Sequence, residues 1–281
     1  MQTQVSPAVS SGMEILTPSS CLTEISTTRI GAVSYLNTKP LIFGLQRRLE
    51  GVAKLSVDLP SRLAAQLADG QIDIGLIPVV EYFKDANYRI VSNAAIACRG
   101  PVWSVRLFFR CEPSQVRTIA MDIGSRTSAA LTKVLFHGQF GFVPDAIPLE
   151  LSDDPRETTA DAVLVIGDRA MHPESLRSHF CSEWDLGQVW LEQTGLPFVF
   201  AMWVARSERF AEATLSKAFE ESREDGILHL DEITLEASQK YGLSQQQCID
   251  YLTNYIHFQL GPNELLGLAE FRSRCKRLNL I

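Results

Sequence analysis

The stretch Arg29-Ile-Gly-Ala-Val-Ser-Tyr-Leu-Asn-Thr-Lys-Pro-Leu41 joins a short apolar run, a polar turn and a helix start. Residues 29–33 are apolar enough for a strand that is buried in a parallel sheet. Residues 34–38 form a polar turn, and Pro40 suits the first turn of a helix on which leucines then recur at helical spacing. The stretch therefore predicts a strand whose carboxyl end leads through polar side chains into a helix.

The same order of elements recurs along the chain. Residues 60–70 indicate a helix that begins at a proline and ends at a glycine, and residues 73–78 indicate the strand that follows it. Further on, a strand at 118–122 leads through a polar turn at 124–128 into an apolar helix face, and 161–168 is another strand. We expect an α/β protein with two similar lobes, each a mixed, mostly parallel sheet flanked by helices.

Two long β-like stretches, residues 105–110 and 198–204, are suited to carry the chain between these lobes. After residue 206 the periodicity is helical to the end, so the last helices are expected to return to the first lobe. The expected division is a disordered extension over 1–28, lobe one over 29–107 and 202–281, and lobe two over 108–201.

The composition is that of an ordinary globular protein, with 46% hydrophobic and 21% charged residues in a chain of 281. The formal net charge of −7 argues against a nucleic-acid or anionic-membrane partner, because both attract a basic surface. Residues 1–28 lack the pattern of a secretory signal, and no apolar run approaches the ~20 residues of a membrane span. We expect a cytoplasmic protein and infer no obligate protein partner.

Metal and cofactor sites are not indicated by the sequence. The six cysteines are scattered without a C-x-x-C pair, and the five histidines do not occur at metal-ligand spacing. The glycine-rich loops that hold nucleotide phosphates are absent as well. We therefore expect reduced cysteines, no metal and no cofactor.

The position of a ligand site follows from the expected sheet, because ligands lie beyond the carboxyl ends of parallel strands. This rule points to the polar turns at 34–38 and 125–128 and to Asp168, at the end of the strand over 161–168. Each turn leads into a helix whose first N–H groups favour a carboxylate or phosphate, and Arg126 can add a charge-assisted contact. The pattern predicts an anion site between the lobes. Simple helix capping is the alternative for Asn37, Ser125, Thr127 and Asp168.

Several segments, in the same order, resemble chorismate dehydratase of the futalosine route to menaquinone. Residues 29–41 resemble the opening signature of that family, and residues 251–271 resemble its closing helices, including Glu264-Leu-Leu-Gly-Leu268. The blocks between them are Asp73–Val79 with Glu81-Tyr82, Gly100–Val105, Ser125–Ser128, Ile166–Asp168, Asp185–Gly187 with Trp190, and Thr194–Phe198. Because the blocks extend from residue 29 to the end of the chain, they are far more specific than a single motif.

The resemblance implies the fold of type II periplasmic binding proteins and the loss of water from chorismate to give 3-[(1-carboxyvinyl)oxy]benzoate. It implies Asn37 as the catalytic residue, holding the departing hydroxyl or the enolpyruvyl group in line. The implied substrate-binding residues are Ser34, Tyr35, Ser104, Ser125, Arg126, Thr127, Ser128 and Asp168. No histidine or lysine in the matched loops is an obvious general base, so the substrate's own carboxylate is the candidate acceptor of the ring proton.

Three other functions stay open at this point. A non-catalytic binding protein for small carboxylates would have the same fold, because a fold does not determine a function. Dihydroxynaphthoate synthase, a later enzyme of the same pathway, shares the fold but has a different opening loop. The effector part of a transcription regulator would need a helix-turn-helix, which residues 1–28 are not suited to form.

Overall fold

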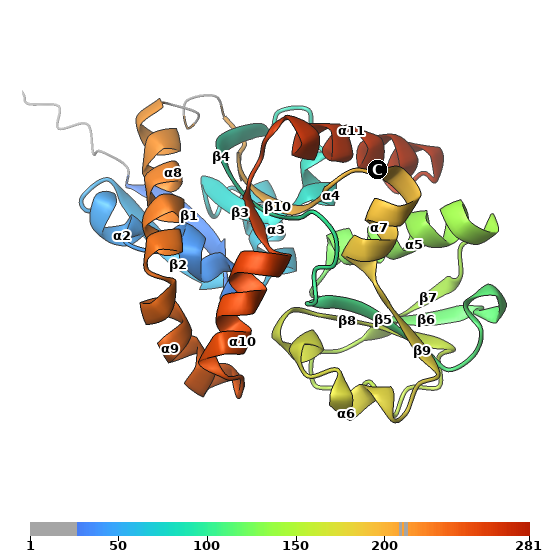
Figure 1. Ribbon diagram of the computed structural model, residues 1–281. Coiled ribbons are helices and arrows are strands. Elements are labelled where there is room, and N and C mark those ends of the chain that lie inside the picture. Colours follow the sequence, from blue (N-terminus) through green and yellow to red (C-terminus); the bar gives the residue numbers. More distant parts are fainter. Residues whose placement is uncertain (1–26, 208–209, 211–212) are drawn as a thin grey trace, which may run out of the picture.

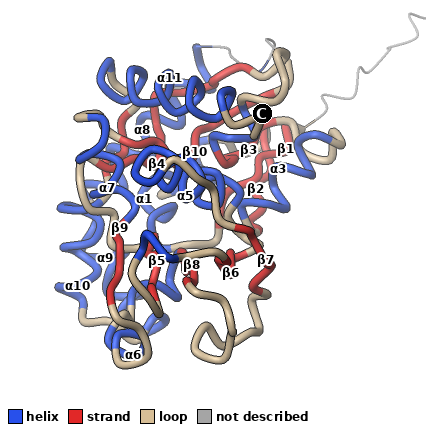
Figure 2. Tube along the Cα trace, turned by 90° about the vertical axis from the view of Figure 1, so that its right-hand side faces the viewer, coloured by secondary structure: helices blue, strands red, loops and turns tan. Residues whose placement is uncertain are grey.

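The computed structural model describes residues 27–207, 210 and 213–281, and its first strand begins at Thr28. The expected extension over 1–28 therefore lies outside the described residues, except for its last two. The chain forms two β-sheets that lie side by side, with helices around both (Figure 1). Viewed from the side, helix α11 (Pro262–Arg277) lies at one end of the molecule and α6 (Glu174–Arg177) at the other (Figure 2).

The first sheet has six strands in the order β11-β4-β10-β3-β1-β2. They are β1 (Thr28–Val33), β2 (Ala53–Asp58), β3 (Ile74–Pro78), β4 (Arg89–Cys98), β10 (Phe198–Ala205) and β11 (His257–Gln259). β1 runs parallel to β2 and β3, and Ile30 aligns with Leu55 and Ile74. β10 runs antiparallel to β3 and β4, and β11 antiparallel to β4. The opening stretch of the sequence thus supplies a buried inner strand, as expected.

The second sheet has five strands in the order β7-β6-β8-β5-β9. They are β5 (Val105–Phe109), β6 (Thr118–Asp122), β7 (Asp145–Leu149), β8 (Ala162–Ile166) and β9 (Ser182–Asp185). β6 pairs in parallel with β7 and β8, whereas β5 pairs antiparallel with β8 and β9. The predicted strands at 118–122 and 161–168 therefore lie next to each other and point the same way.

Both sheets are mixed, as expected, but parallel pairs do not predominate in either one. Among the described strands, two of five pairings in the first sheet and two of four in the second are parallel. The strands next to the crossings between the sheets, β4, β5 and β10, account for the antiparallel pairs. The periodicity of a buried strand does not record the direction of its neighbour, so the sequence did not show this.

The chain crosses between the sheets twice, after Cys98 and before Phe198. Val105 already belongs to β5 of the second sheet, and all of β10 belongs to the first. The expected lobe boundaries, at 107/108 and 201/202, therefore each fall inside a strand. The sequence pattern marks a strand here without showing which sheet it joins.

The helices that surround the sheets are mostly short at the start of the chain and longer toward its end. The remaining ones are α1 (Lys39–Ile42), α2 (Leu45–Arg48), α3 (Pro60–Ala68), α4 (Val79–Tyr82), α5 (Arg126–Phe140), α7 (Leu186–Thr194), α8 (Ala213–Leu228), α9 (Leu230–Tyr241) and α10 (Gln245–Asp250). Three 3₁₀ turns, η1 (Leu36–Thr38), η2 (Pro113–Gln115) and η3 (Gly167–Met171), and a π-helical turn, η5 (Tyr251–Tyr255), complete the described elements. The single helix expected after Pro40 is divided into α1 and α2, because Gly44 between them has a left-handed φ of 68°.

The two lobes share one continuous apolar core at their junction. Trp190 of α7 packs edge-on against Phe198 of β10 and Phe271 of α11, with ring centroids 5.2 and 5.9 Å apart. Helix α11 approaches the second crossing closely: a side chain at Gly267 would meet the carbonyl oxygen of Pro197 at 2.0 Å. The junction is therefore a packed contact, which fixes the two sheets relative to each other.

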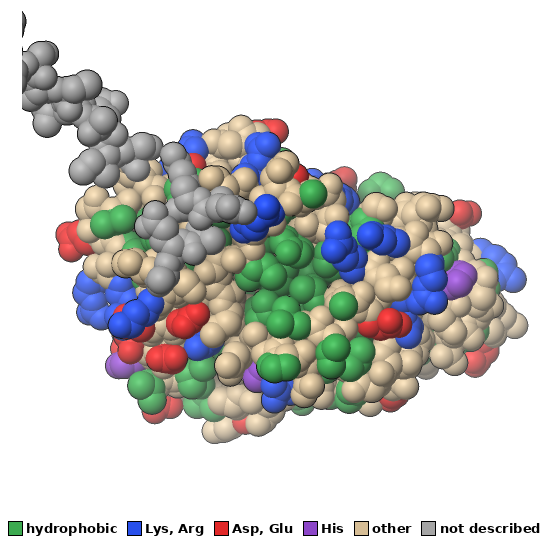
Figure 3. Space-filling view, turned by 90° about the horizontal axis from the view of Figure 1, so that it is seen from above, with side chains coloured by type: hydrophobic (Ala, Val, Ile, Leu, Met, Phe, Trp, Pro, Cys, Tyr) green, Lys and Arg blue, Asp and Glu red, His purple; other side chains and the backbone are tan. Residues whose placement is uncertain are grey.

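Charged side chains lie around an apolar area on one face of the molecule (Figure 3). Figure 3 shows basic side chains beside apolar ones on the face seen from above, and α11 carries Arg274, Lys276 and Arg277 in its last turn. Within the described part of the chain, no helix combines the length and the apolar character that a membrane span requires.

Candidate functional site

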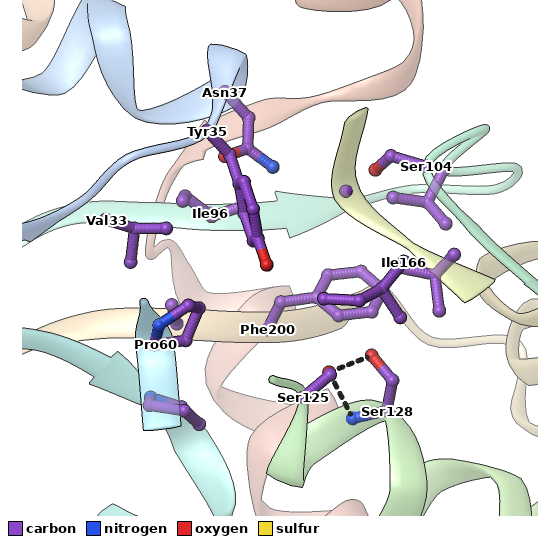
Figure 4. A pocket seen from close by; sticks show the side chains of 15 residues that line it. Val33, Tyr35, Asn37, Pro60, Ile96, Ser104, Ser125, Ser128, Ile166 and Phe200 are labelled. Atoms are coloured by element: carbon purple, nitrogen blue, oxygen red, sulfur yellow. Dashed lines mark hydrogen bonds between the residues drawn. The ribbon is translucent and has the colours of Figure 1, made fainter. Parts of the chain in front are cut away.

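A hollow lies between the two lobes, with about 530 Å³ of space between the atoms when the open solvent at its mouth is included. Its walls come from the carboxyl ends of β1, β3 and β8, from β4 and β10, from the first crossing, and from the starts of α3 and α5. The residues that line it are Val33, Tyr35, Asn37, Pro60, Pro78, Ile96, Val102, Ser104, Val105, Ser125, Ser128, Ile166, Gly167, Phe200 and Ala201. Figure 4 shows Tyr35 and Asn37 on one side of it and Ser125 and Ser128 on the opposite side.

Asn37 belongs to η1, directly after β1, and its residue is 9% exposed. Its Nδ2 donates a hydrogen bond to the hydroxyl of Tyr251 at 3.0 Å. Its Oδ1 is buried without a hydrogen-bond partner among the described residues. A buried acceptor without a donor is costly, so this oxygen is suited to a hydroxyl or N–H group that a ligand brings.

Ser104 lies in the first crossing and reaches the hollow from the other side of Tyr251. The Tyr251 hydroxyl donates to Ser104 Oγ at 2.8 Å. The backbone of Ser104 is fixed as well, because its carbonyl oxygen accepts a hydrogen bond from Gly167 N at 2.8 Å. Asn37, Tyr251 and Ser104 thus form a buried chain of hydrogen bonds that joins three distant parts of the sequence.

The turn before Ser104 is held in an unusual conformation. Trp103 has a φ of 62°, in the left-handed region that side chains other than glycine rarely occupy. The carboxylate of Asp185 accepts hydrogen bonds from Val102 N at 2.9 Å and from Trp103 N at 2.7 Å. The same carboxylate caps α7 by accepting from Gly187 N and Gln188 N. Burial raises the pKa of Asp185, and these N–H donors oppose that rise.

On the opposite wall, Ser125 is the N-cap of the long helix α5. Its Oγ accepts a hydrogen bond from Ser128 N at 3.2 Å and its hydroxyl donates to Ser128 Oγ at 2.7 Å. The capping alternative is therefore confirmed for Ser125, which also lines the hollow. Because Ser128 Oγ accepts that bond, its own hydrogen is available to a ligand. The helix start adds a partial positive charge, so this wall suits a carboxylate.

Arg126 and Thr127 do not line the hollow, although they follow Ser125 directly. The Arg126 guanidinium pairs with Glu81 of α4, with Nη1 and Oε2 3.1 Å apart. Thr127 Oγ1 donates to Phe200 O at 3.3 Å and accepts a hydrogen bond from Val80 N at 3.4 Å. Both side chains connect the second lobe to the first, so the geometry gives them a role in lobe contact.

Ser34 and Asp168 also lie outside the lining residues. Ser34 is partly buried, and its N–H donates to Asp58 O at 3.2 Å. Asp168 opens η3, and its Oδ1 accepts a hydrogen bond from Leu36 N at 3.4 Å, which links the lobes beside Asn37. Burial raises the pKa of Asp168 to about 6, against the opposing effects of the Leu36 N–H and Lys240. This carboxylate therefore titrates close to neutral pH.

Tyr35 extends from the polar turn into the hollow, as expected (Figure 4). Its ring lies against Gly167, where an added Cβ would be 3.1 Å from the ring carbons. Burial, helped by the negative charges of Asp122 and Asp168, raises the pKa of Tyr35. The side chain therefore presents a neutral hydroxyl to a ligand at physiological pH.

The chemistry of the wall is limited in kind. Among the described residues, those that line the hollow include no histidine, lysine, arginine, cysteine or carboxylate, and Tyr35 is the one side chain there that can titrate. The described residues also contain no group of three His, Cys, Asp or Glu that could hold a metal ion. What the walls offer is serine and tyrosine hydroxyls, one amide and a helix start. Such groups bind and orient a ligand and are poor acceptors of a proton from carbon.

Two residues that shape the site had no assigned role on the sequence alone, Tyr251 and Asp185. Tyr251 lies 214 residues from Asn37 and 147 from Ser104 in the chain. Asp185 lies 82 residues from Trp103. Asp185 stands directly before a helix, and this pattern could have predicted its role as an N-cap. No local pattern connects Tyr251 to the hollow.

Known proteins resemble this chain in sequence and in fold. Chorismate dehydratase of Thermus thermophilus is 30% identical over 259 residues, which is 86% of this chain and 93% of that protein. A solved protein of Archaeoglobus fulgidus superposes with a TM-score of 0.71 at 18% identity, over 91% of this chain and 98% of its own. A Candida albicans protein with the generic periplasmic binding protein fold superposes with a TM-score of 0.61 at 13% identity, over 90% of this chain and 94% of its own.

At these low identities the two solved structures bear on the fold alone, and they confirm the expected two-lobed fold class. The family is shown by sequence. A family model described as menaquinone biosynthesis matches residues 28–277, which is nearly all of the described chain. This protein therefore belongs to the menaquinone biosynthesis family.

Proposed function

We propose that this protein is a hydro-lyase that removes water from chorismate to give 3-[(1-carboxyvinyl)oxy]benzoate. The proposal is supported by the relative of that activity and by the family. The observation that carries it is the hollow between the lobes, which is lined by hydroxyl side chains from both lobes and by Asn37, whose buried Oδ1 has no hydrogen-bond partner among the described residues. Chorismate has one hydroxyl and two carboxylates, which matches one buried acceptor and several donors.

The roles of the wall residues follow from this match. The ring hydroxyl of chorismate donates to Asn37 Oδ1, and this contact holds the C–O bond that breaks. Ser125, Ser128 and the start of α5 receive one carboxylate, and Ser104 and Tyr35 are the donors for the other. Arg126 and Thr127 act at the lobe contact, where their bonds to Glu81 and Phe200 hold the second lobe against the first.

The proton balance does not require a base from the wall. The hydroxyl leaves one ring carbon and a proton leaves the neighbouring carbon, so that together they form water and the ring becomes aromatic. Since the lining residues of the described chain contain no histidine, lysine or carboxylate, the enolpyruvyl carboxylate of the substrate takes the proton from the ring carbon and passes it to the departing hydroxyl, which leaves as water. The protein contributes mainly by holding one conformer between its lobes, which converts orientation into rate.

Turnover of chorismate by the wild type separates this proposal from the non-catalytic binding alternative, and the Asn37→Ala variant tests the role of Asn37. Loss of the side chain that orients the breaking C–O bond should lower kcat by about 10²-fold, because a reacting group that is misplaced by about 1 Å loses rate on that order. The affinity for chorismate changes less, because the two carboxylates retain their partners. Steady-state kinetics with chorismate measure both quantities. Turnover that is unchanged in Asn37→Ala contradicts the role of Asn37, and chorismate binding without turnover in the wild type supports the binding-protein alternative.

A further inference from the structure

Tyr251 is the fully buried link between the two polar groups that face the hollow from the first lobe and the crossing. Its side chain is 0% exposed. Its hydroxyl accepts a hydrogen bond from Asn37 Nδ2 at 3.0 Å and donates one to Ser104 Oγ at 2.8 Å. Tyr251 itself does not line the hollow, so it acts on a ligand through these two neighbours.

The hydrogen bonds in this chain have a fixed order. An amide nitrogen donates and does not accept, so the Tyr251 oxygen accepts from Asn37 and its hydrogen goes to Ser104. Ser104 Oγ then accepts, and its own hydrogen is directed elsewhere. In this order Asn37 offers an acceptor, Oδ1, and Ser104 offers a donor to the hollow.

The reverse order is also self-consistent. If the Asn37 amide turns over, its oxygen accepts from Tyr251, and Tyr251 then accepts from Ser104. Asn37 would now offer a donor and Ser104 an acceptor. A single hydroxyl cannot satisfy a mixture of the two orders, so the orientation of the amide and the role of Ser104 change together.

We propose that Tyr251 is a positioning residue that couples Ser104 to Asn37, so that a ligand carboxylate at Ser104 fixes the Asn37 carbonyl oxygen toward the ligand hydroxyl. This inference rests on the proposed function, in which one ligand supplies both groups. A carboxylate at Ser104 requires a donor there, and that requirement selects the order in which Asn37 is an acceptor. The site then recognises a carboxylate and a hydroxyl as a pair.

The surroundings of Tyr251 are built to hold it still. Tyr251 is the first residue of η5, a π-helical turn. Such turns are rare in proteins, and those that do occur are often found at functional sites. Its ring meets the strained Trp103 edge-on at 5.6 Å, and Trp103 also stacks on Tyr255 of the same turn at 5.7 Å. Burial raises the pKa of Tyr251, so the phenol keeps the hydrogen that the chain needs.

The variant Tyr251→Phe tests the coupling, and Tyr255→Phe is its matched control. Both substitutions remove one phenolic oxygen from η5 beside Trp103, but in the described structure Tyr251 alone of the two bonds to Asn37 and Ser104. We expect kcat for chorismate to fall about 10-fold or more in Tyr251→Phe, with a smaller change in KM. Tyr255→Phe should stay within about twofold of the wild type.

Two further readouts separate positioning from a general loss of structure. In an Asn37→Ala background, Tyr251→Phe should cause no further loss of kcat, because the group that it positions is gone. The wild type should also bind chorismate far better than an analogue with hydrogen in place of the ring hydroxyl. Tyr251→Phe should reduce this ratio of affinities about 10-fold, because without the Tyr251 hydroxyl the Asn37 amide is no longer held in one orientation. If Tyr251→Phe does not fold, Ser104→Ala breaks the same chain and should reduce the same ratio.

The coupling is overturned if Tyr251→Phe behaves like Tyr255→Phe, or if its effect adds in full to that of Asn37→Ala. A wild-type protein that leaves chorismate unchanged overturns the proposed function instead. In that case binding measurements alone test the coupling. If Tyr251→Phe and Ser104→Ala both still bind chorismate better than the deoxy analogue by the wild-type ratio, the coupling is contradicted.

Discussion

Replacing Asp185 by alanine removes the carboxylate that holds the crossing next to Ser104. In the structure this carboxylate accepts four backbone hydrogen bonds, two from Val102 and Trp103 and two from the first turn of α7. It holds Trp103 at a φ of 62° and so fixes the backbone position of Ser104, the next residue. We predict that Asp185→Ala loses both stability and turnover.

The magnitude follows from the bonds that are lost. Loss of the helix cap costs about 1 kcal/mol. Each of the two bonds from the crossing to a charged acceptor is worth roughly 1.5–3 kcal/mol. Relaxation of Trp103 out of the left-handed region returns about 1–2 kcal/mol. The unfolding free energy should therefore fall by about 4 kcal/mol, and Tm by about 10 °C.

The assay needs a variant that loses similar bonds away from the hollow. Asp161 is suited to this, because its Oδ2 accepts hydrogen bonds from Arg117 N and Thr118 N, each at 2.9 Å, near the far end of β6. Asp161→Ala should lose stability but keep its kcat for chorismate. Asp185→Ala, measured well below its Tm, should lose kcat about 10-fold or more because Ser104 moves. Equal kcat values in the two variants would refute the reasoning that Asp185 positions Ser104.

Three further predictions concern the second lobe. The folded pKa of Asp168, about 6, lies above the ordinary 3.8, so the wild type loses stability as pH rises between these values. Asp168→Asn cannot titrate and so lacks this loss. In urea unfolding, its stability relative to the wild type should therefore be greater at pH about 8 than at pH about 5. A difference in stability that does not change with pH would contradict the raised pKa of Asp168. Gly167→Ala forces a side chain at a φ of 61° into the Tyr35 ring, and should cost about 1–3 kcal/mol in thermal unfolding with a raised KM; an unchanged KM would show that Tyr35 does not contact the substrate. Arg126→Ala removes the ion pair with Glu81, in which the arginine side chain is 42% exposed. The variant should lower the unfolding free energy by less than about 1 kcal/mol and raise KM less than about threefold. A much larger increase in KM would indicate that Arg126 binds the substrate.

The sequence predicted the parts of the site that depend on local order. A buried strand followed by a polar turn placed Asn37 and Tyr35 at the hollow, and the polar start of α5 placed Ser125 and Ser128 opposite them. Their position could be predicted because the carboxyl end of a strand and the start of the next helix are neighbours in the chain, whereas their roles toward a substrate stay predictions.

The parts that depend on distant packing could not be predicted in this way. Arg126 and Thr127 share the turn of Ser125, but the first turn of α5 points them at Glu81 and Phe200 of the other lobe. Tyr251 reaches Asn37 only because η5 returns to the first crossing. Neither contact leaves a periodic signal, since each is set by the meeting of the two lobes.

The most direct test of the central claim is the mass of the product that purified protein forms from chorismate. We predict an aromatic product that is lighter than chorismate by one water and keeps the enolpyruvyl group. We also predict that the product is formed without added metal or cofactor. Release of pyruvate, a rearranged product of unchanged mass, or chorismate that is bound but unchanged would contradict that claim.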